Sequence, residues 1–432
     1  MNYKAYDKYK DSGIDWLGEI PEGWEVRRFG DFYKSRMGET ILANQLLENG
    51  KVPVLSATEE DNIFGYLDTA NVVLKEGDIV IPARGSSIGH VKLISFPCTS
   101  TQTTILCQSL NKSDPKYTKY HLLGLRNILF YFDRTAIPQV TVEQIKSNIF
   151  LIPPISEQKT IANFLDHKIK EIDDLIAKKE ELLKLLAEKR TALITNAVTK
   201  GLNPNAKMKD VGIAWLGDIP EQSKVERLDH TAKIKTSNVD KKIQEDEALV
   251  KLCNYVDIYY NEKITSEINF MEASASFTEI EKFKLKKGDV VLTKDSESPS
   301  DIGIPALIEE NIDSLVCGYH LAVLESIPNK TYGGYLYYAI KSRSSAVQFE
   351  VLANGVTRFG LSKDDMKSLL IVLPSIEDQK IIADFLDKKT SEIDQTTTKI
   401  KEAIERLKEY RTSLITNAVT GKINVLNFSG NL

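Results

Sequence analysis

The sequence contains few of the residues that form disulfides or metal sites. Its 432 residues include only four cysteines and five histidines, all widely spaced and without a Cys-x-x-Cys pair. This spacing favours reduced, buried thiols and argues against a disulfide framework or a zinc site. There is also no run of about 18 apolar residues, and the N-terminus is polar, so neither a transmembrane helix nor a signal peptide is expected. These absences predict a cytoplasmic protein that binds no membrane, metal or cofactor.

Signatures of catalysis are missing as well. The sequence has no Gly-x-Gly-x-x-Gly, no His-Glu-x-x-His and no methyltransferase-like Asn-Pro-Pro-Tyr. The nearest match to a phosphate-binding loop, residues 355–362, has Leu361 where such a loop needs lysine. Asp-x-Lys pairs at 166–168 and 387–389 fit the end of a nuclease pattern, but they lie in predicted helices, where surface ion pairs explain them better. We therefore expect no catalytic residue in this chain.

The charge balance excludes another simple explanation. The 56 basic and 61 acidic residues give a formal charge of -5, so the field of the whole protein does not attract a polyanion. A nucleic acid, if bound, must meet local patches. Composition is that of an ordinary globular protein, with 42% hydrophobic and 27% charged residues. The length favours two or three domains.

The most informative feature is an internal repeat. Three segments recur: 14–22 as 213–221, 74–80 as 285–291, and 158–199 as 379–420. In the last pair, 24 of 42 positions are identical without a gap. The offset between the copies grows from 199 to 221 residues, so the second copy carries insertions in its interior. A duplicated frame with different interiors indicates a pseudo-two-fold pair of modules that perform similar tasks on different targets.

The third repeated segment predicts two long helices. From Ser156 to Thr199 there is neither proline nor glycine, and Glu, Lys, Leu and Ala dominate. Ser156 is expected to cap the first helix and Ser375-x-x-Asp378 to form a capping box on the second. Gly201 and Gly421 stand where the two helices should end.

Each predicted helix carries a heptad seam. Alternating steps of three and four select positions of which nine of eleven in the first helix and eight of eleven in the second are apolar. The seams favour packing of the two helices as an antiparallel coiled coil. They are Ala162, Leu165, Ile169, Ile172, Ile176, Lys179, Leu183, Leu186, Arg190, Leu193 and Ala197, and Ala383, Leu386, Thr390, Ile393, Thr397, Ile400, Ile404, Leu407, Arg411, Leu414 and Ala418.

Identity between the two helices extends beyond the seam to polar positions at their ends. A coiled coil that merely dimerises a protein does not need these residues, so docking of a shared partner is a second explanation. The candidate subunit-docking residues are Gln158, Lys159, Asp166, Arg190, Asn196, Gln379, Lys380, Asp387, Arg411 and Asn417.

Each module has a mixed α and β pattern. We expect hairpins that turn at Gly-Asp within 72–81 and 283–293, and further strands at 88–94 and 315–324. Helices are predicted at 116–131, 332–351, 141–147 and 362–368. Thr141-x-x-Gln144 and Ser362-x-x-Asp365 should cap the last two.

Loops at equivalent places in both modules combine cations, amides and hydroxyls. Arginine pairs with guanine, glutamine with adenine, and hydroxyls with several bases, so such sets suit DNA. A solvated turn explains any single loop as well, and only the recurrence in both modules favours DNA. The candidate DNA-binding residues are Arg84, Ser86, Ser87, Gln102, Thr103, Arg134, Gln139, Lys294, Ser296, Ser298, Asn354 and Arg358.

These features together resemble the specificity subunit of type I restriction-modification systems. The likeness is carried by Trp-Leu-Gly-Glu-Ile-Pro-Glu-Gly-Trp at 16–24, by the Gly-Asp turn, by Leu-x-Pro-x-Ile-x-Glu-Gln-Lys-x-Ile-Ala at 151–162 and by the long helix, all of which recur. It covers essentially the whole chain. The second copy departs from the pattern at Ser223, where the first has Trp24.

The resemblance implies a non-catalytic subunit that binds double-stranded DNA. Two target-recognition domains would each read half of a split, asymmetric site, and the helices would fix the spacer. Two methyltransferase subunits, which bind S-adenosylmethionine, would dock on the helices, and ATP-dependent restriction subunits would join them. A coiled-coil scaffold without base readout and a degenerate DNA-modifying enzyme remain as alternatives.

The expected fold class is α+β, with two mixed α/β domains separated by the antiparallel helices. The expected boundaries are 1–155 for the first domain, 156–200 for the first helix, 201–374 for the second domain, 375–421 for the second helix and 422–432 for a C-terminal tail.

Overall fold

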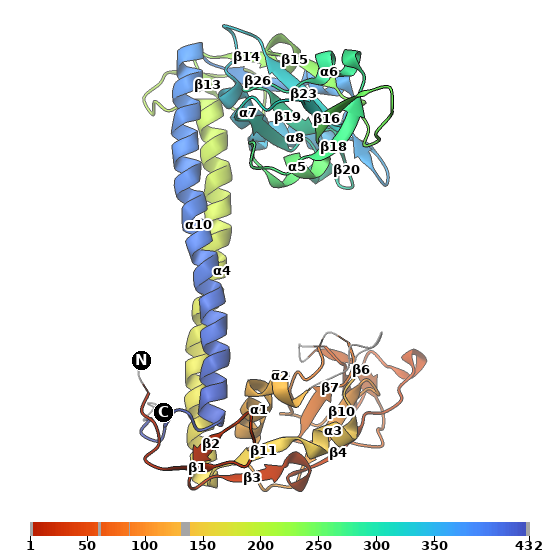
Figure 1. The fold of residues 1–432 in the computed structure, drawn as a ribbon, viewed down its shortest axis with the longest axis vertical. Coiled ribbons are helices and arrows are strands. Elements are labelled where there is room, and N and C mark those ends of the chain that lie inside the picture. The colour runs from red at the N-terminus through yellow and green to blue at the C-terminus, as the bar shows by residue number, and fades with distance from the viewer. Residues whose placement is uncertain (1–2, 59–61, 86, 131–138, 429–432) are drawn as a thin grey trace. The chain divides into compact units, whose positions relative to one another are not determined.

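The computed structural model describes residues 3–58, 62–85, 87–130 and 139–428. The chain forms two compact units, here called unit 1 (residues 1–180 and 401–432) and unit 2 (residues 181–400). Each unit contains one globular module and a part of each of two long helices (Figure 1). Among the described residues, none of the helices combines the length and the hydropathy that a membrane span requires.

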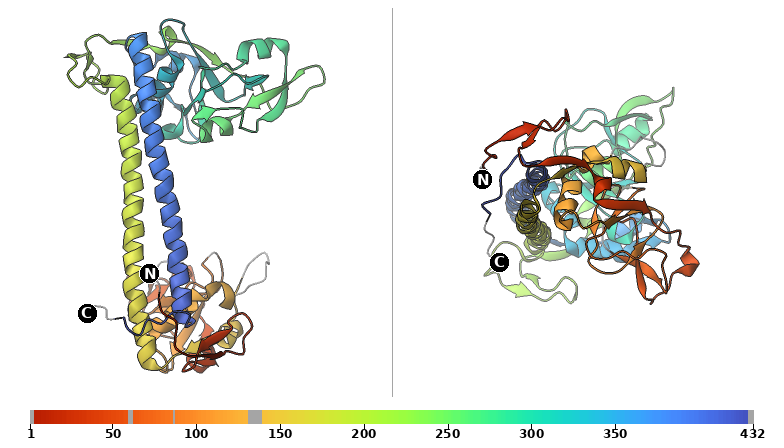
Figure 2. Two further views of the ribbon diagram at one scale, coloured as in Figure 1. Left: turned by 60° about the vertical axis from the view of Figure 1, so that its left-hand side comes forward. Right: turned by 90° about the horizontal axis from the view of Figure 1, so that it is seen from below.

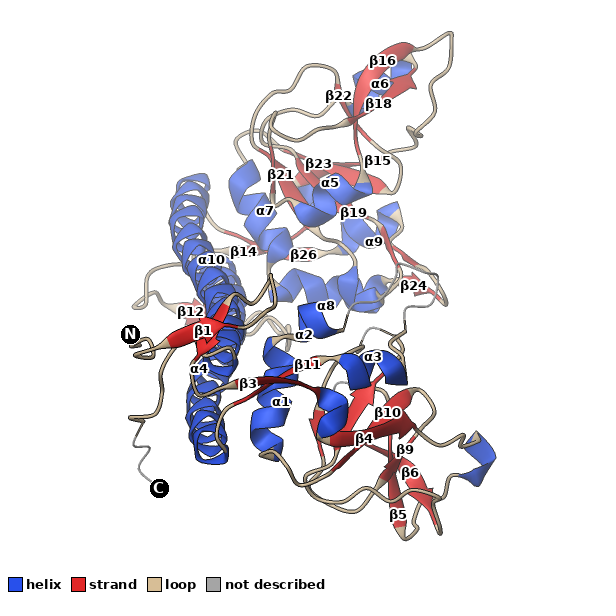
Figure 3. Cartoon of the chain, turned by 60° about the horizontal axis from the view of Figure 1, so that its bottom comes forward, coloured by secondary structure: helices blue, strands red, loops and turns tan. Residues whose placement is uncertain are grey.

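The module of unit 1 is built on small sheets covered by short helices (Figure 3). A four-stranded sheet has the order β4 (Tyr33–Met37), β10 (Thr104–Ser109), β7 (Ile79–Pro82), β8 (Lys92–Leu93). A three-stranded sheet has the order β6 (Ile63–Leu67), β5 (Val52–Leu55), β9 (Thr99–Ser100). The remaining elements are the pairs β1 (Tyr9–Asp11) with β2 (Glu19–Pro21) and β3 (Glu25–Arg28) with β11 (Ile149–Ile152), and the helices α1 (Pro115–Gly124), α2 (Arg126–Leu129) and α3 (Val142–Ser147).

The module of unit 2 repeats this plan with additions. Its largest sheet has the order β15 (Ala232–Thr236), β23 (Leu321–Ser326), β19 (Val290–Thr293), β21 (Pro305–Ile308), β17 (Lys263–Ile264). A three-stranded sheet has the order β18 (Met271–Ala275), β16 (Ala248–Cys253), β22 (Leu315–Cys317). The counterparts of the smaller pairs are β12 (Met208–Lys209) with β13 (Ile219–Pro220) and β14 (Lys224–Arg227) with β26 (Leu370–Leu373).

Unit 2 also has elements without a named counterpart in unit 1. They are the helices α5 (Tyr255–Tyr260) and α6 (Phe277–Phe283) and the sheet β20 (Asp295–Ser296), β25 (Phe359–Gly360), β24 (Asn354–Gly355). Its other helices are α7 (Gly333–Lys341), α8 (Arg343–Leu352) and α9 (Lys363–Ser368). In both large sheets the last strand in sequence, β10 or β23, is inserted between the first strand and the strand that follows the Gly-Asp turn. The sheet β6-β5-β9 and the sheet β18-β16-β22 each combine one antiparallel and one parallel pairing. The repeated sequence therefore folds into a repeated topology.

The expected Gly-Asp hairpins are wrong. Gly77 and Gly288 do form turns, each with φ +89°. The strand that follows each turn, however, pairs with β10 and β8 in unit 1 and with β23 and β21 in unit 2. The reason lies in the next residue: the buried Asp78 carboxylate accepts the backbone N–H groups of Lys75 and Ser109 at 2.9 and 2.8 Å, which ties the turn to β10.

The predicted short helices are present, but the two longer ones are interrupted. Residues 116–131 contain most of α1 and all of α2, and residues 332–351 contain all of α7 and most of α8. Ser342 accepts the Ser345 N–H and begins a new helix there. Both capping boxes are confirmed, on α3 by Thr141 and Gln144 and on α9 by Ser362 and Asp365. Of the strands expected at 88–94, only β8 is present, whereas 315–324 contains β22 and the start of β23.

The two long helices are α4 (Ile155–Lys200) and α10 (Ile376–Val419). Ser375 accepts the Asp378 N–H as predicted. Ser156 is not the cap of α4, because the helix already begins at Ile155 and the Gln158 N–H bonds the Pro154 carbonyl. Gly201, with φ +71°, follows α4 directly, a position that glycine occupies without strain.

Every position of the predicted seam is buried or half-buried, whereas Leu175, Leu182 and Leu185 outside it are 42–53% exposed. Within each unit α4 and α10 lie side by side and run in opposite directions (Figures 1 and 2). An ion pair crosses them in each: Arg411 Nε lies 2.8 Å from Asp173 Oδ1 in unit 1, and Arg190 Nε lies 3.0 Å from Asp394 Oδ1 in unit 2.

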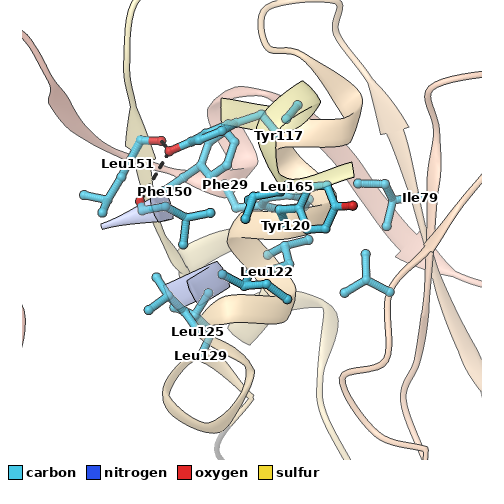
Figure 4. Packing of buried hydrophobic residues seen from close by; sticks show 14 of the residues in the cluster. Phe29, Ile79, Tyr117, Tyr120, Leu122, Leu125, Leu129, Phe150, Leu151 and Leu165 are labelled. Carbon is cyan, nitrogen blue, oxygen red and sulfur yellow. Dashed lines mark hydrogen bonds between the residues drawn. The ribbon is translucent and has the colours of Figure 1, made fainter. Parts of the chain in front are cut away.

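A buried tyrosine attaches each module to one of the two long helices, α10 in unit 1 and α4 in unit 2. In unit 1 the Tyr117 hydroxyl donates to the Leu151 carbonyl at 3.0 Å and lies 3.5 Å from the Val419 carbonyl (Figure 4). In unit 2 Tyr335 donates in the same way to the Val372 and Val198 carbonyls, at 2.6 and 3.1 Å. Because burial raises the pKa of both phenols, they remain neutral donors.

Unit 1 contains a buried histidine that makes its stability sensitive to acid. His121 is fully buried, its Nε2 accepts the Leu151 N–H at 3.2 Å, and burial lowers its pKa to about 3. Below the ordinary histidine pKa of about 6.5 the unfolded chain takes up a proton and the folded chain does not. We expect unit 1 to lose about 2 kcal/mol of stability between pH 7 and pH 5. Urea unfolding at both pH values should show this loss, and His121→Gln should abolish it.

The control is His230→Gln at an exposed histidine of unit 2, a variant that should leave the acid loss of unit 1 in place. A loss of stability between pH 7 and pH 5 that is equally large in His121→Gln would contradict the assignment of the acid sensitivity to His121.

Candidate nucleic-acid interface

Three segments of unit 1 that are distant in sequence meet beyond the end of β7. Arg84 forms an antiparallel β-bridge with Gln139. The Ala83 N–H donates to the Thr103 carbonyl, and the Val140 N–H donates to the Ala83 carbonyl, both at 2.9 Å. The structure therefore brings together three residues that the sequence predicted separately as DNA contacts.

The corresponding segments of unit 2 meet in the same way. Asp295 pairs with Gly360, the Lys294 N–H donates to the His320 carbonyl at 3.0 Å, and the Leu361 N–H donates to the Lys294 carbonyl at 2.8 Å. Here the pairing continues into β24, so that Asn354 also lies opposite Gly360. The turn that contains Arg358 connects β24 to β25.

The matching backbone bonds identify two residues that sequence reasoning missed. His320 occupies the place of Thr103, and Tyr319 occupies the place of Gln102. The sequence contains a signal for this correspondence, because β10 starts directly after Thr103, β23 starts directly after His320, and the two strands align with each other. The intervening insertions hid this alignment.

In unit 1 the exposed side chains of this site are two amides and one guanidinium. Arg84, Gln102 and Gln139 are exposed, and Gln102 Oε1 accepts the Thr40 hydroxyl at 3.0 Å. Thr103 is half-buried, with its hydroxyl 2.8 Å from the Thr101 hydroxyl. A guanidinium fork and amides on one surface match the hydrogen-bonding edges of guanine and adenine in the major groove.

In unit 2 the site is more aromatic and more acidic. Arg358 is exposed, and Tyr319 is 49% exposed. Lys294 Nζ lies 5.1 Å from the Tyr319 ring centroid and 3.7 Å from Asp295 Oδ2, and the same carboxylate oxygen lies 2.6 Å from His320 Nδ1. Carboxylates accept from the cytosine amino group. The two sites therefore have the same backbone frame and different readout chemistry.

Helix α5 adds aromatic surface beside the unit 2 site. The Tyr255 and Tyr259 rings stack with centroids 5.6 Å apart, and Tyr260 is 78% exposed. Burial and the charge of Asp301 raise the pKa of Tyr255, whereas the Ser296 hydroxyl and the charge of Arg358 act in the opposite direction. Because α5 lies in an insertion without a counterpart in unit 1, the repeat did not point to it.

Several predicted contact residues do not face solvent or are already bonded. Ser87 and Ser296 are only 8% and 7% exposed, so the expectation that they read DNA is corrected: their hydroxyls belong to the module interior. Ser298 accepts the Ser300 N–H and caps a short turn, and Asn354 Nδ2 donates to the Leu352 carbonyl at 2.8 Å while the residue stays exposed. Two further predictions, Ser86 and Arg134, lie outside the described residues.

The glutamines predicted to dock a partner are buried instead. Gln158 and Gln379 are 1% and 0% exposed. Gln158 Oε1 accepts the Asp114 N–H at 2.8 Å, and its Nε2 donates to the Pro153 carbonyl at 2.8 Å. Gln379 does the same with the Tyr332 N–H and the Pro374 carbonyl. Their identity in the two copies reflects the attachment of each module to its helix.

Most of the charged docking candidates also have internal partners. Asp166 accepts the Tyr120 hydroxyl at 2.8 Å, Asp387 accepts the Tyr338 hydroxyl at 2.9 Å, and Arg190 and Arg411 form the ion pairs between the helices. The docking role of these four residues stays a prediction, because Asp166, Asp387 and Arg411 keep 36–40% of their side-chain surface exposed. The remaining candidates are Lys159, Lys380, Asn196 and the half-buried Asn417.

The buried amides allow a direct test of their structural role. Replacing Gln379 by alanine leaves the partly buried Tyr332 N–H without its acceptor, an effect of about 1–2 kcal/mol. We expect the midpoint of thermal unfolding of unit 2 to fall accordingly. Lys380→Ala, at the exposed neighbouring position, should leave the midpoint unchanged; equal effects of the two variants would argue against the structural role.

The described residues contain no group of three or more His, Cys, Asp or Glu side chains able to hold a metal ion. All four cysteines are buried, as the sequence predicted, and burial raises the pKa of Cys107 to about 12.

A family model described as the type I restriction modification DNA specificity domain matches the chain twice, over residues 21–185 and 220–406. The chain is 25% identical over 426 residues to the type I restriction enzyme MjaVIII specificity subunit of Methanocaldococcus jannaschii, covering 95% of each. It is 21% identical to the EcoKI specificity subunit of Escherichia coli strain K12, covering 94% of this chain and 90% of that protein.

Solved structures show the same fold. A chain from a study of complex assembly and conformational transition of the type I R-M system aligns with a TM-score of 0.71 and 13% identity, covering 93% of this chain and 98% of that one. The HsdS subunit from Thermoanaerobacter tengcongensis aligns with a TM-score of 0.54 and 16% identity, covering 94% and 98%.

Proposed function

Because the chain belongs to the family of type I restriction-modification DNA specificity subunits, which are non-catalytic, we propose that each of its modules reads one half of a split, asymmetric DNA site. The observation that carries the proposal is the recurrence of one backbone arrangement with different side chains. The bridge between Arg84 and Gln139 in unit 1 corresponds to the pair of Asp295 and Gly360 in unit 2. A shared backbone arrangement that carries different side chains suits the reading of two different half-sites.

In this proposal unit 1 reads bases through Arg84, Gln102 and Gln139, with Thr103 as a secondary contact. Unit 2 reads bases through Arg358, Asn354 and the Asp295 carboxylate, and Tyr319 and Lys294 border the same surface. Arginine to guanine and glutamine to adenine are the pairings that the major groove favours.

The long helices act as the spacer between the half-sites. The buried seam and the ion pairs in each unit support an antiparallel coiled coil with pseudo-two-fold symmetry. Two methyltransferase subunits, which carry S-adenosylmethionine, dock near the exposed Lys159, Asn196 and Lys380, and ATP-dependent restriction subunits complete the assembly. With a net charge of -5, the isolated chain should bind DNA weakly and with strong salt dependence, because its partners share the phosphate contacts.

The test is to co-express the chain with a cognate methyltransferase subunit and to map adenine methylation on genomic DNA by single-molecule sequencing. A split, asymmetric motif is expected. Exchange of residues 29–150 for the same region of another specificity subunit should change one half of the motif and leave the other. Absence of methylation in a stable complex that binds S-adenosylmethionine would favour a coiled-coil scaffold instead.

A further inference from the structure

The two copies differ at one buried position beside the start of their long helices. In unit 1 the Trp24 side chain is fully buried, and its Nε1 donates to Glu157 Oε1 at 3.0 Å. The Tyr6 hydroxyl donates to the same oxygen at 2.5 Å, and its ring meets the indole edge to face, with centroids 5.9 Å apart. Two aromatic rings and one carboxylate therefore fill this place.

The repeat replaces all three groups by smaller ones in unit 2. Ser223 stands for Trp24, Asn205 for Tyr6, and Asp378 for Glu157. These three residues line a cavity of about 440 Å³, together with Pro220, Pro374 and Ile382. A volume of this size lies within the range of small-ligand sites, about 300–1,000 Å³. We call this cavity the unit 2 pocket.

The walls of the unit 2 pocket keep the chemistry that holds the indole in unit 1. Asp378 Oδ2 accepts the Ser375 hydroxyl at 2.8 Å, and Oδ1 has no hydrogen-bond partner among the described residues. Pro220, Pro374 and the buried Ile382 supply apolar surface. An aromatic ring with an N–H or O–H group fits such a site, because the ring packs against the apolar wall and the donor pairs with the carboxylate.

Exposed apolar side chains border the unit 2 pocket. Ile381 at the mouth is 58% exposed. A second hollow of about 510 Å³ adjoins the first, shares residues 200–203 with it, and reaches Met208. Leu202 and Met208 are 37% and 40% exposed. This exposed apolar border provides contacts for the residues that flank a ring in a polypeptide, which a free small molecule does not use.

We propose that the unit 2 pocket binds a tryptophan or tyrosine side chain of a partner polypeptide, with the donor of the ring on Asp378. The contact is confined to unit 2, because Trp24 occupies the equivalent place in unit 1. It is independent of DNA readout and is tested on the full chain without DNA.

The first experiment follows the ¹⁹F signal of N-acetyl-5-fluorotryptophanamide during titration with the full chain. Saturable line broadening is expected with the native chain and none with Ser223→Trp, which fills the pocket. Asp378→Ala should weaken binding at least tenfold, while Asp384→Ala, an exposed aspartate on the same helix, should not. No broadening, or equal binding by Ser223→Trp, would overturn the proposal.

The second experiment tests the shape of the pocket. Ser223→Trp, and the double variant Ser223→Trp with Asp378→Glu that recreates the pair of unit 1, should each raise the midpoint of thermal unfolding. A lower midpoint in both would show that the cavity does not accept an indole and would refute the proposal.

The third experiment separates a polypeptide from a free ring. The peptide acetyl-Gly-Leu-Trp-Leu-Gly-amide should displace the fluorinated probe at a concentration at least tenfold lower than indole does, and the peptide with serine in place of tryptophan should not displace it. Displacement by indole at an equal or lower concentration would assign the pocket to a small aromatic molecule and overturn the polypeptide as its occupant.

Discussion

Replacing Arg358 by alanine is expected to lower methylation about 10- to 100-fold at native sites and to relax selectivity at one base position of one half-site. The guanidinium is exposed on the turn between β24 and β25, beside the Asp295 strand, and it makes no ion pair within the described residues. A bidentate contact to guanine contributes about 1–3 kcal/mol of discrimination, which corresponds to this range.

The measurement uses the complex with the methyltransferase subunit and a set of duplexes that differ by single bases in each half-site. Arg84→Ala is the reciprocal variant and should relax the other half-site. Arg343→Ala, whose guanidinium pairs with Glu350 on α8, is the control and should change neither. A loss by Arg358→Ala that is uniform over all duplexes, with a shallower salt dependence, would reassign Arg358 to a phosphate contact.

The long helices, their seam and most of the helix ends were predictable because they depend on local sequence. Helix propensity, heptad spacing and capping residues act over a few positions, and Ser362 with Asp365 shows a capping box that four residues encode. The repeat extended this local information to the second copy. Where the two copies have similar sequences, a correct helix prediction for one copy also holds for the other.

The candidate site was only partly predictable, because its parts meet through non-local pairing. The bridge of Arg84 to Gln139 depends on how β7 and the segment before α3 are placed, which no local pattern encodes. The burial of Ser87 and Ser296 and the partners of Gln158 have the same origin. Tyr319 and α5 were missed because insertions removed the alignment between the copies, so the repeat gave no signal for them.

Replacing Gly333 by alanine is expected to destabilise unit 2 by about 3 kcal/mol, at the upper end of what overpacking usually costs. Helix propensity alone predicts the opposite, since alanine stabilises a helix by about 1 kcal/mol relative to glycine. Packing decides the sign here: a Cβ at this position would lie 2.1 Å from the Gly288 carbonyl oxygen. That oxygen is backbone, in the tight turn before β19, and does not move aside as a flexible side chain would.

The consequence extends beyond the turn because α7 carries Tyr335 and Tyr338, which hold the module on both long helices. Thermal unfolding should show a midpoint about 6–12 °C lower for the transition of unit 2 in Gly333→Ala. Gly23→Ala is the matched control, because a Cβ there has no neighbour within 4 Å, and its midpoint should stay unchanged. A Gly333→Ala variant as stable as the control would contradict this prediction. It would mean that the start of α7 can shift away from the Gly288 turn without weakening the attachment of the module to the helices.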